Sequence, residues 1–321
     1  MIRWGFLGAG YVAGVAVAPA VHAARGAVLQ AAAARDPQRA EALGPVTVHP
    51  SYDALLADPD VDAVYVNLTN EAHLPWTLAA LAAGKHVLCE KPLGLSAEEV
   101  DVMDAARGPL RVVEASWYRW HPRIRLAQQR LTEIGAVEHV SAGFAFAGVP
   151  DGNYRLDPLR GGGALYDVGH YAVSAVLWAT GRGLPTDVSA RTRRGPSGVD
   201  LMTEAVLDWD GCSAEVRAGI DEGLGQWLVI TGRDGELELR DSPYTSWKDD
   251  ATQLWVSDGT GTERVDVPAT DAYQVMVEEV SSVLSGGPGW ALPLAESRLT
   301  AATLDLIGQA LPWREVQPRD P

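Results

Sequence analysis

The N-terminal residues carry the pattern that most restricts how this chain can fold. An apolar run at residues 2–7 is typical of a buried strand, and it is followed at once by GAGYVA at residues 8–13. In a G-x-G-x-x-A pattern the first glycine permits a tight turn, the second admits close approach to the backbone, and the small last residue lets a helix pack on the strand. The pattern therefore predicts a strand, a tight turn and a helix, the unit from which parallel α/β sheets are built.

Strand-like and helix-like segments continue to alternate up to about residue 118. Apolar runs predict strands, and Ala- and Leu-rich periodic segments between them predict helices. Ser96 and Glu99 have the spacing of a capping box. The expected strands are residues 2–7, 27–34, 61–68, 85–89 and 110–116, and the expected helices are 11–24, 37–43, 74–83 and 100–106. This alternation predicts a parallel sheet flanked by helices.

The pattern changes in the rest of the chain. Strands dominate after residue 119, and Asp-Gly pairs at residues 210–211 and 234–235 mark tight hairpin turns of an antiparallel sheet. The length of 321 residues also exceeds the ~150 residues usual for one domain. We therefore expect an α/β domain of the Rossmann type at 1–118 and an α+β domain at 119–321. Helices are expected in this second part near residues 123–133, 164–180, 273–284 and 294–311.

Charge and cysteine content restrict the partners and the compartment. With 26 Lys and Arg against 42 Asp and Glu, the formal net charge is −16, so neither nucleic acid nor a membrane surface is an expected partner. Cys89 and Cys212 provide no disulfide framework and no zinc-ligand spacing, so we expect a cytoplasmic protein without a metal. Residues 3–24 superficially resemble a secretory signal, but four glycines and Pro19 interrupt the stretch.

The glycine pattern and the end of the second strand together indicate a dinucleotide site. A helix that starts directly after such a turn presents backbone N–H groups to a pyrophosphate. The second strand ends at Ala34, Arg35 and Asp36, with Arg39 one turn later. If Ala34 occupies the discriminating position, no carboxylate blocks a 2′-phosphate and Arg35 can pair with it, which favours NADP. If Asp36 points inward instead, NAD is preferred.

A second polar motif follows a later strand. Glu90, Lys91 and Pro92 come directly after an apolar run, at the edge where open α/β sheets bind ligands. Lys91 could donate a hydrogen bond to a reacting oxygen there. Taken alone, Glu90 and Lys91 are also compatible with a surface ion pair.

Three segments together resemble one known protein family. They are GAGYVA at residues 8–13, GKHVLCEKP at residues 84–92 and GGGALYDVGHY at residues 161–171. The chain resembles the glucose-fructose oxidoreductase / inositol dehydrogenase / rhizopine-catabolism (Gfo/Idh/MocA) family over nearly its whole length. The resemblance implies that the second domain is a large, mostly antiparallel open sheet covered by helices on one face. Its other face is then available to a subunit, which implies a homodimer or homotetramer.

The resemblance also implies catalytic residues. In this family the lysine of Glu-Lys-Pro contacts substrate and cofactor, and a helix of the second domain supplies the pattern D-x-G-x-H or D-x-G-x-Y. Carried over, these residues are Lys91, Asp167 and Tyr171. Asp167 and Tyr171 are four positions apart and share a helix face, whereas His170 points about 100° away. We therefore favour Tyr171, and His170 remains the alternative if the helix register differs.

The implied function is that of an NAD(P)-dependent oxidoreductase. Hydride moves between nicotinamide and a sugar, polyol or ketosugar, with Tyr171 as acid/base, Lys91 polarising the reacting oxygen, and Asp167 orienting Lys91 or a substrate hydroxyl. The alternatives are a dihydrodiol dehydrogenase, a reductase of free or nucleotide-linked 3-ketosugars, and a sensor that binds the cofactor without turnover. The expected cofactor-binding residues are Gly8, Gly10, Tyr11, Val12, Arg35, Arg39, Leu68, Asn70, His73, Glu90 and Lys91.

Several residues considered for binding could instead have a role in the fold alone. His73 can equally satisfy backbone groups at a helix start. Four arginines could hold a phosphorylated or nucleotide-linked sugar, or be solvated or paired with Asp157 and Glu133. They are Arg119, Arg123, Arg155 and Arg160.

Overall fold

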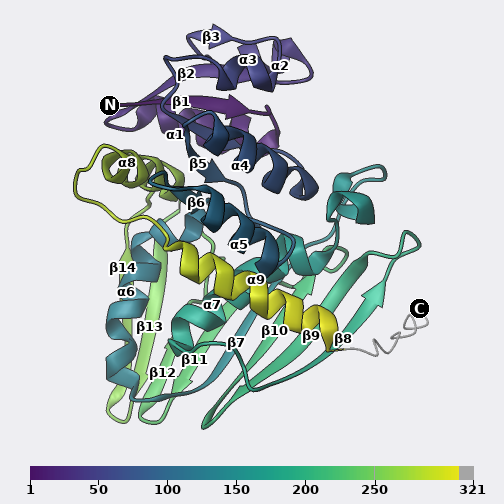
Figure 1. Cartoon of the computed structure of the whole chain (residues 1–321). Coiled ribbons are helices and arrows are strands. Elements are labelled where there is room, and N and C mark those ends of the chain that lie inside the picture. The colour runs from purple at the N-terminus through teal and green to yellow at the C-terminus, as the bar shows by residue number, and fades with distance from the viewer. Residues whose placement is uncertain (249, 311–321) are drawn as a thin grey trace. The chain divides into compact units, whose positions relative to one another are not determined.

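A computed structural model describes residues 1–248 and 250–310 of the chain, which form two compact units (Figure 1). The first unit contains residues 1–120 and 271–298. The second contains residues 121–270 and continues from residue 299. Each unit has its own sheet.

The first unit is built on a six-stranded parallel sheet with the order β3-β2-β1-β4-β5-β6. Its central strands are buried because they are short, nearly continuous apolar runs, and this confirms the predicted Rossmann-type sheet. The strands are β1 (Ile2–Leu7), β2 (Ala27–Ala33), β3 (Thr47–Val48), β4 (Ala63–Val66), β5 (His86–Cys89) and β6 (Val112–Glu114). The short strand β3 had no counterpart among the expected strands.

Helices of the first unit begin where the sequence places capping residues. The Ser96 hydroxyl accepts from the Glu99 backbone N–H (3.2 Å), which confirms the Ser96 cap, and Glu99 Oε2 accepts from the Leu95 N–H (2.7 Å), one residue earlier than in a regular capping box. A π-helical turn at Ala13–Val17 lies between the helix start at Tyr11 and α1. The helices are α1 (Ala18–Ala23), α2 (Pro37–Glu41), α3 (Tyr52–Leu56), α4 (His73–Ala82), α5 (Ala97–Ala106) and α8 (Ala272–Leu284).

Helix α8 belongs to the first unit, whereas the expected boundary assigned everything after residue 118 to the second. Its apolar side is buried, and Tyr273 stacks on Trp117 with 4.7 Å between ring centroids. The Trp4 indole N–H also donates to Ser281 Oγ across 3.0 Å. An amphipathic helix shows in its sequence that it has a buried face, but not which surface covers that face, so only the fold reveals this assignment.

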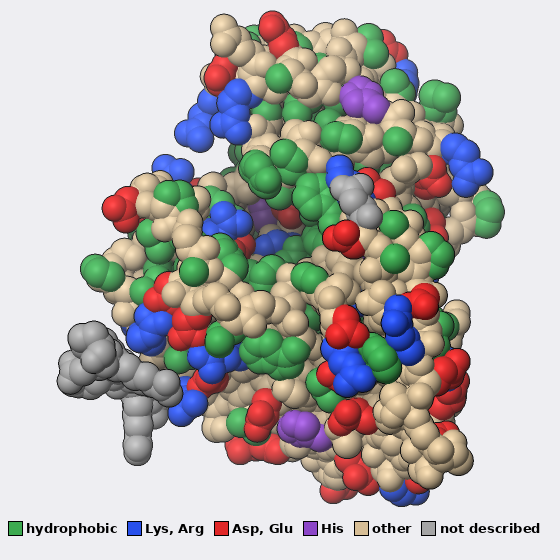
Figure 2. Space-filling model, turned by 180° about the vertical axis from the view of Figure 1, so that it is seen from behind, with side chains coloured by type: hydrophobic (Ala, Val, Ile, Leu, Met, Phe, Trp, Pro, Cys, Tyr) green, Lys and Arg blue, Asp and Glu red, His purple; other side chains and the backbone are tan. Residues whose placement is uncertain are grey.

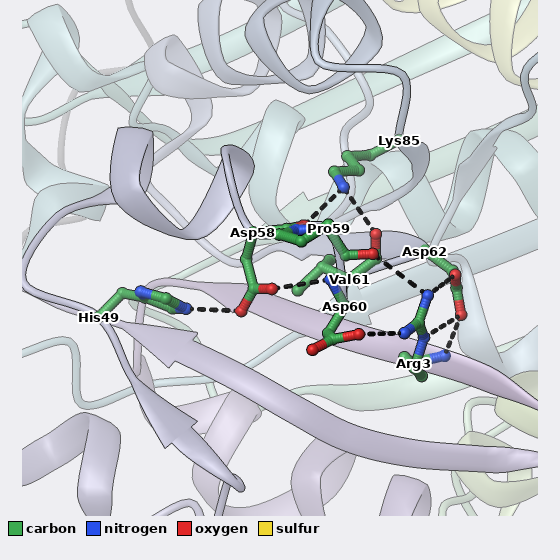
Figure 3. Close-up of polar contacts among 8 residues, drawn as sticks. All are labelled: Arg3, His49, Asp58, Pro59, Asp60, Val61, Asp62 and Lys85. Carbon is green, nitrogen blue, oxygen red and sulfur yellow. Dashed lines mark hydrogen bonds and ion pairs between the residues drawn. The ribbon is translucent and has the colours of Figure 1, made fainter.

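The N-terminal edge of the same sheet is held by a polar cluster, shown in Figure 3. Arg3 pairs with Asp60 (2.6 Å) and Asp62 (2.8 Å). Lys85 Nζ donates to the backbone carbonyls of Asp58 (2.8 Å) and Val61 (2.7 Å). Because ligands bind parallel sheets at the carboxyl ends of the strands, this opposite edge serves to hold the loop before β4.

The second unit is built on an eight-stranded sheet with the order β14-β13-β12-β11-β7-β10-β9-β8. All neighbouring strands are antiparallel except β7 and β10, which pair in parallel. This confirms the expected open, mostly antiparallel sheet. The strands are β7 (Val137–Ala145), β8 (Asp187–Arg194), β9 (Asp200–Trp209), β10 (Cys212–Gly219), β11 (Gly225–Gly232), β12 (Gly235–Glu238), β13 (Thr252–Asp258) and β14 (Gly261–Val267).

Hairpin turns in this sheet follow the glycines of the sequence. Asp210 and Gly211 form the two-residue turn between β9 and β10, and Gly211 has a φ of +69°, a conformation that glycine adopts without steric cost. The strand β14 was not expected, although Asp258 and Gly261 pair across a two-residue loop.

Helices α6 (Pro122–Arg130) and α7 (His170–Thr180) pack on the sheet, α6 on β13 and α7 on β7 and β10 (Figure 1). Helix α9 (Leu294–Gln309) begins in the first unit and ends in the second. A concavity of about 490 Å³ lies on the sheet, lined by Ser141, Arg191, Glu204, Val206, Arg217 and Trp227. On the face of the molecule in Figure 2, basic side chains lie among acidic ones rather than in one basic patch.

Within residues 1–248 and 250–310, no helix combines the length and apolar character needed to span a bilayer.

Candidate active site

The glycine turn after β1 has no room for side chains. Gly8 has a φ of +96°, and a Cβ added there would lie 2.3 Å from the Asn67 carbonyl oxygen. A Cβ on Gly10 would lie 2.4 Å from Asn67 Oδ1. The first N–H groups of the helix that starts at Tyr11 have no partner within that helix. This backbone-lined turn at a helix start fits the pyrophosphate of a dinucleotide.

Asn67, directly after β4, holds this turn from the neighbouring strand. The Gly10 backbone N–H donates to Asn67 Oδ1 across 2.9 Å. Sequence reasoning missed Asn67, although a polar residue that directly follows a buried apolar strand was the available signal. Among the expected cofactor residues, Leu68 and Asn70 lie in the same loop, Tyr11 is exposed and Val12 is half-buried. Their contact with a cofactor stays a prediction.

Glu90 is a buried group rather than half of a surface ion pair. Only 8% of the residue is exposed, and the Tyr65 hydroxyl donates to Glu90 Oε1 across 2.5 Å. The Lys91 backbone N–H points to Glu90 Oε2 at 3.3 Å. Burial raises the pKa of Glu90, while the Tyr65 hydrogen bond and the Lys91 charge oppose this shift. Tyr65 was also missed from the sequence, because strand residues are read first as core.

The segment after Glu90 is clamped by two further buried side chains. His73, at the start of α4, places Nδ1 2.7 Å from the Pro92 carbonyl oxygen and Nε2 3.2 Å from that of Leu68. Glu114, at the end of β6, accepts from the Leu93 backbone N–H across 2.8 Å. Burial lowers the pKa of His73. A neutral imidazole carries one N–H, so the ring donates to one of these two carbonyls at a time. His73 therefore lies between the loop after β4 and the segment after Lys91, and its contact with a cofactor stays a prediction.

The residues expected to select the cofactor lie after β2. Asp36 caps α2, because its Oδ1 accepts from the Gln38 backbone N–H across 3.0 Å. One oxygen of its carboxylate is therefore engaged by the helix start, and its part in cofactor choice stays a prediction. Arg35 and Arg39 are both exposed.

In the second unit, a half-buried carboxylate anchors the helix that bears Asp167 and Tyr171. Asp200 Oδ2 accepts from the Leu165 backbone N–H and from the Thr203 hydroxyl, each across 2.8 Å. Gly163 leaves space for this carboxylate, because a Cβ there would lie 2.1 Å from Asp200 Oδ1. Burial raises the pKa of Asp200 to about 6. Sequence reasoning missed Asp200, which lies 35 residues from its partner Leu165.

Asp167 is paired with Arg155 rather than standing alone on its helix. Arg155 Nε lies 2.6 Å from Asp167 Oδ2, a partner that the sequence did not suggest for this arginine. Burial would lower the pKa of Arg155, but the neighbouring Asp167, Tyr154 and Tyr171 together raise it. The charges of Asp167 and Tyr171 therefore both raise the pKa of the same guanidinium.

The helix register around these residues departs from a regular α-helix. Residues Leu165–Gly169 form a π-helical turn, and α7 begins at His170. Tyr171 is buried, with its ring centroid 5.7 Å from that of Phe144. A π turn changes the angle between successive side chains, so the spacing argument against His170 loses force.

The other expected arginines are held by the protein itself. Arg123 is buried, and its guanidinium donates to Ser242 Oγ (2.7 Å) and Ser246 Oγ (3.2 Å), among other groups. Its burial lowers its pKa to about 10. Arg119 pairs with Glu296 across 2.9 Å, and Arg160 with Asp157 across 3.3 Å. The idea that Arg119 and Arg123 hold a sugar phosphate is therefore wrong, because both are buried and already bonded.

The predicted catalytic residues are divided between the two units. Lys91 follows β5 in the first unit, and Asp167 and Tyr171 lie in the second. Their joint role stays a prediction.

Comparison with known proteins agrees with this architecture. Residues 2–108 match a family described as oxidoreductase, NAD-binding Rossmann fold, and residues 124–238 match the GFO/IDH/MocA C-terminal domain. A D-xylose 1-dehydrogenase (NADP(+)) 2 of Haloferax volcanii is 37% identical, over 95% of this chain and 96% of the relative. A trans-1,2-dihydrobenzene-1,2-diol dehydrogenase of Sus scrofa is 32% identical, over 75% of this chain and 74% of the relative.

A solved structure shows the same fold. It is KijD10, a 3-ketoreductase from Actinomadura kijaniata in complex with NADP and TDP-benzene. It superposes with a TM-score of 0.88 and 27% identity, covering 96% of this chain and 97% of that one. With both family domains matched in order and a relative 37% identical over nearly the full length, the chain belongs to the Gfo/Idh/MocA family of NAD(P)-dependent oxidoreductases.

Proposed function

We propose that this protein transfers hydride between NADP(H) and a hydroxyl-bearing carbon of a sugar, polyol or ketosugar. The observation that carries the proposal is the placement of the glycine turn, Asn67 and Lys91. They follow β1, β4 and β5, which are neighbours in one parallel sheet, so all three lie at its carboxyl edge. The relatives named above are a D-xylose dehydrogenase, a dihydrodiol dehydrogenase and a 3-ketoreductase, which supports a substrate of this class.

The protein groups in this proposal handle the substrate oxygen and its proton. Bound nicotinamide supplies or accepts the hydride. In the oxidising direction, Tyr171 Oη takes the proton of the substrate hydroxyl, while Lys91 Nζ donates a hydrogen bond to the same oxygen. Asp167, held by Arg155, orients Lys91 or a neighbouring substrate hydroxyl. Reduction reverses these steps.

Arg35 is proposed to favour NADP over NAD. With Asp36 engaged as a helix cap, a 2′-phosphate meets the exposed Arg35 and no inward carboxylate. We expect Arg35→Ala to weaken NADPH binding by about tenfold and to leave NADH binding nearly unchanged, because a charge-assisted hydrogen bond to the phosphate is lost.

Titration of both cofactors by fluorescence checks this prediction. Arg25→Ala is the matched control, because the Arg25 side chain is 92% exposed and pairs only loosely with Glu278, at 3.4 Å. Equal NADPH affinity in Arg35→Ala and the wild type contradicts the assignment.

A substrate panel tests the function itself. The absorbance of the reduced nicotinamide is followed with aldoses, ketosugars, nucleotide-linked ketosugars and dihydrodiols, in both directions. Turnover with at least one carbohydrate supports the proposal, and preference for a dihydrodiol favours that alternative. Tight NADPH binding without turnover on any of these compounds supports the sensor alternative instead.

We also propose that the protein is a homo-oligomer that uses the sheet surface around Val206. Val206 is exposed, and the ion pair of Arg217 with Glu204 (2.8 Å) lies beside it in the same concavity. A solution mass that is a multiple of 34.2 kDa by light scattering supports this, and a mass of 34.2 kDa contradicts it. The cytoplasmic location stays a prediction.

A further inference from the structure

We propose that Tyr65 and Asn67 form a positioning relay that links the glycine turn, through Glu90, to the position of Lys91 and to the negative charge beside it. The proposal rests on the proposed function, in which Lys91 contacts the reacting oxygen. Tyr65 and Asn67 would touch neither substrate nor reacting atoms, so they are positioning residues. We call Gly10, Asn67, Tyr65 and Glu90 the relay.

Every link of the relay is a hydrogen bond within the first unit. The Gly10 backbone N–H donates to Asn67 Oδ1 (2.9 Å), and Asn67 Nδ2 reaches Tyr65 Oη at 3.4 Å. Tyr65 Oη–H donates to Glu90 Oε1 (2.5 Å), and Glu90 Oε2 accepts from the Lys91 backbone N–H at 3.3 Å. Strands β4 and β5 pair in register from Ala63 to Val66, which brings the two strand ends side by side.

The hydrogen bond from Gly10 to Asn67 determines which group donates and which accepts in the bonds that follow it. A backbone N–H can only donate, so the oxygen of the Asn67 amide faces Gly10 and its nitrogen faces Tyr65. Tyr65 Oη then accepts from this nitrogen, and its own hydrogen is directed to Glu90. A carboxylate that receives hydrogen bonds from Tyr65 and from the Lys91 N–H is satisfied in its ionised form. Through Asn67 and Tyr65, the Gly10 backbone N–H thus favours the ionised form of Glu90, which lies beside Lys91.

Burial makes this arrangement sensitive to the loss of one donor. Tyr65 is fully buried, and the burial of Glu90 favours its neutral form. Burial raises the Glu90 pKa. Among the groups that lower it, the Tyr65 hydroxyl has the largest effect, ahead of the Lys91 charge. The titratable groups facing Tyr65 and Glu90 from the surrounding elements are Cys89, Lys91, Glu114 and Tyr273.

Tyr65→Phe is the principal test, because it removes the hydroxyl and keeps the ring. We expect kcat to fall about tenfold and NADPH affinity to change less than about threefold, since the glycine turn keeps its Asn67 contact. Without its donor, Glu90 becomes protonated at a higher pH, so the acid limb of the kcat profile moves to higher pH. A merely structural hydroxyl would not move this limb.

Asn67→Ala tests the other end of the relay, and it also serves if Tyr65→Phe does not fold. In the free protein, hydrogen exchange of the Gly10 amide, measured by NMR, should become faster in Asn67→Ala and remain unchanged in Tyr65→Phe. The double variant should lose no more kcat than the larger single loss, because both changes break one relay. Unchanged Gly10 exchange in Asn67→Ala, or additive kcat losses, contradicts the relay.

Two control variants distinguish a failure of the relay from a failure of the proposed function. Ser281→Ala removes a buried hydrogen bond to Trp4 in the same unit and should lower stability without shifting the kcat profile. If Tyr65→Phe behaves like Ser281→Ala, the relay is wrong. Lys91→Ala tests the proposed function: if it retains turnover, that function is wrong. If Lys91→Ala abolishes turnover while Tyr65→Phe changes neither kcat nor its pH profile, only the relay is wrong.

Discussion

Replacing Tyr171 with phenylalanine is expected to lower kcat by about 10²- to 10⁴-fold, the usual contribution of a general acid or base. NADPH affinity should be retained, because the expected cofactor residues lie in the first unit and Tyr171 lies in the second. The fold should also be retained, since Tyr171 is only 6% exposed and its ring packs beside Phe144, a contact that phenylalanine keeps. Single-turnover kinetics with the best substrate of the panel measures the effect.

Two matched variants decide whether the loss belongs to Tyr171. Tyr244→Phe removes the hydroxyl of another buried tyrosine of the second unit and should leave kcat near the wild-type value. His170→Ala tests the neighbouring residue, which stays a candidate for the acid/base role because of the π-helical turn before α7. A large loss in His170→Ala with normal turnover in Tyr171→Phe transfers the acid/base role to the histidine.

Gly8→Ala should affect binding most strongly, with NADPH affinity reduced at least about tenfold. The backbone at Gly8 has a φ of +96°, which a residue with a Cβ adopts only with strain. The added Cβ would also lie 2.3 Å from the Asn67 carbonyl oxygen, a backbone atom that cannot rotate away. Together these effects should lower the free energy of unfolding by about 2–4 kcal/mol.

Gly26→Ala is the control for Gly8→Ala. Gly26 has a similar φ of +80°, but no atom lies within 4 Å of a Cβ added there. It should lose only about 1–2 kcal/mol of unfolding free energy and bind NADPH normally. Urea unfolding and cofactor titration of both variants separate conformational strain from close approach. Equal losses in the two variants would show that the contact with Asn67 contributes nothing.

The parts of the site that depend on backbone conformation were predictable from the sequence. GAGYVA at residues 8–13 acts through glycine dihedrals and helix packing within a few residues, so its signal is local. The helix cap at Ser96 was predictable for the same reason. The expected α/β and antiparallel sheets followed from the period of apolar residues, which is also a local property.

Contacts between distant segments were not predictable in this way. Asn67 meets Gly10 across 57 residues, and Asp200 meets Leu165 across 35. Arg123 looked like a candidate ligand-binding residue, but its partners Ser242 and Ser246 lie more than 100 residues away along the chain. A side chain's partner depends on which strands are adjacent, and a single sequence does not encode this in any local pattern.

The sequence by itself determined the family, the two kinds of sheet and the glycine turn, because these depend on short motifs and on periodicity. Only the tertiary structure decided that Glu90 is buried, that Asp36 caps a helix and that α8 belongs to the first unit. The physical reason is that the burial and charge of a group depend on the surface packed against it. That surface is formed by residues far away in the chain.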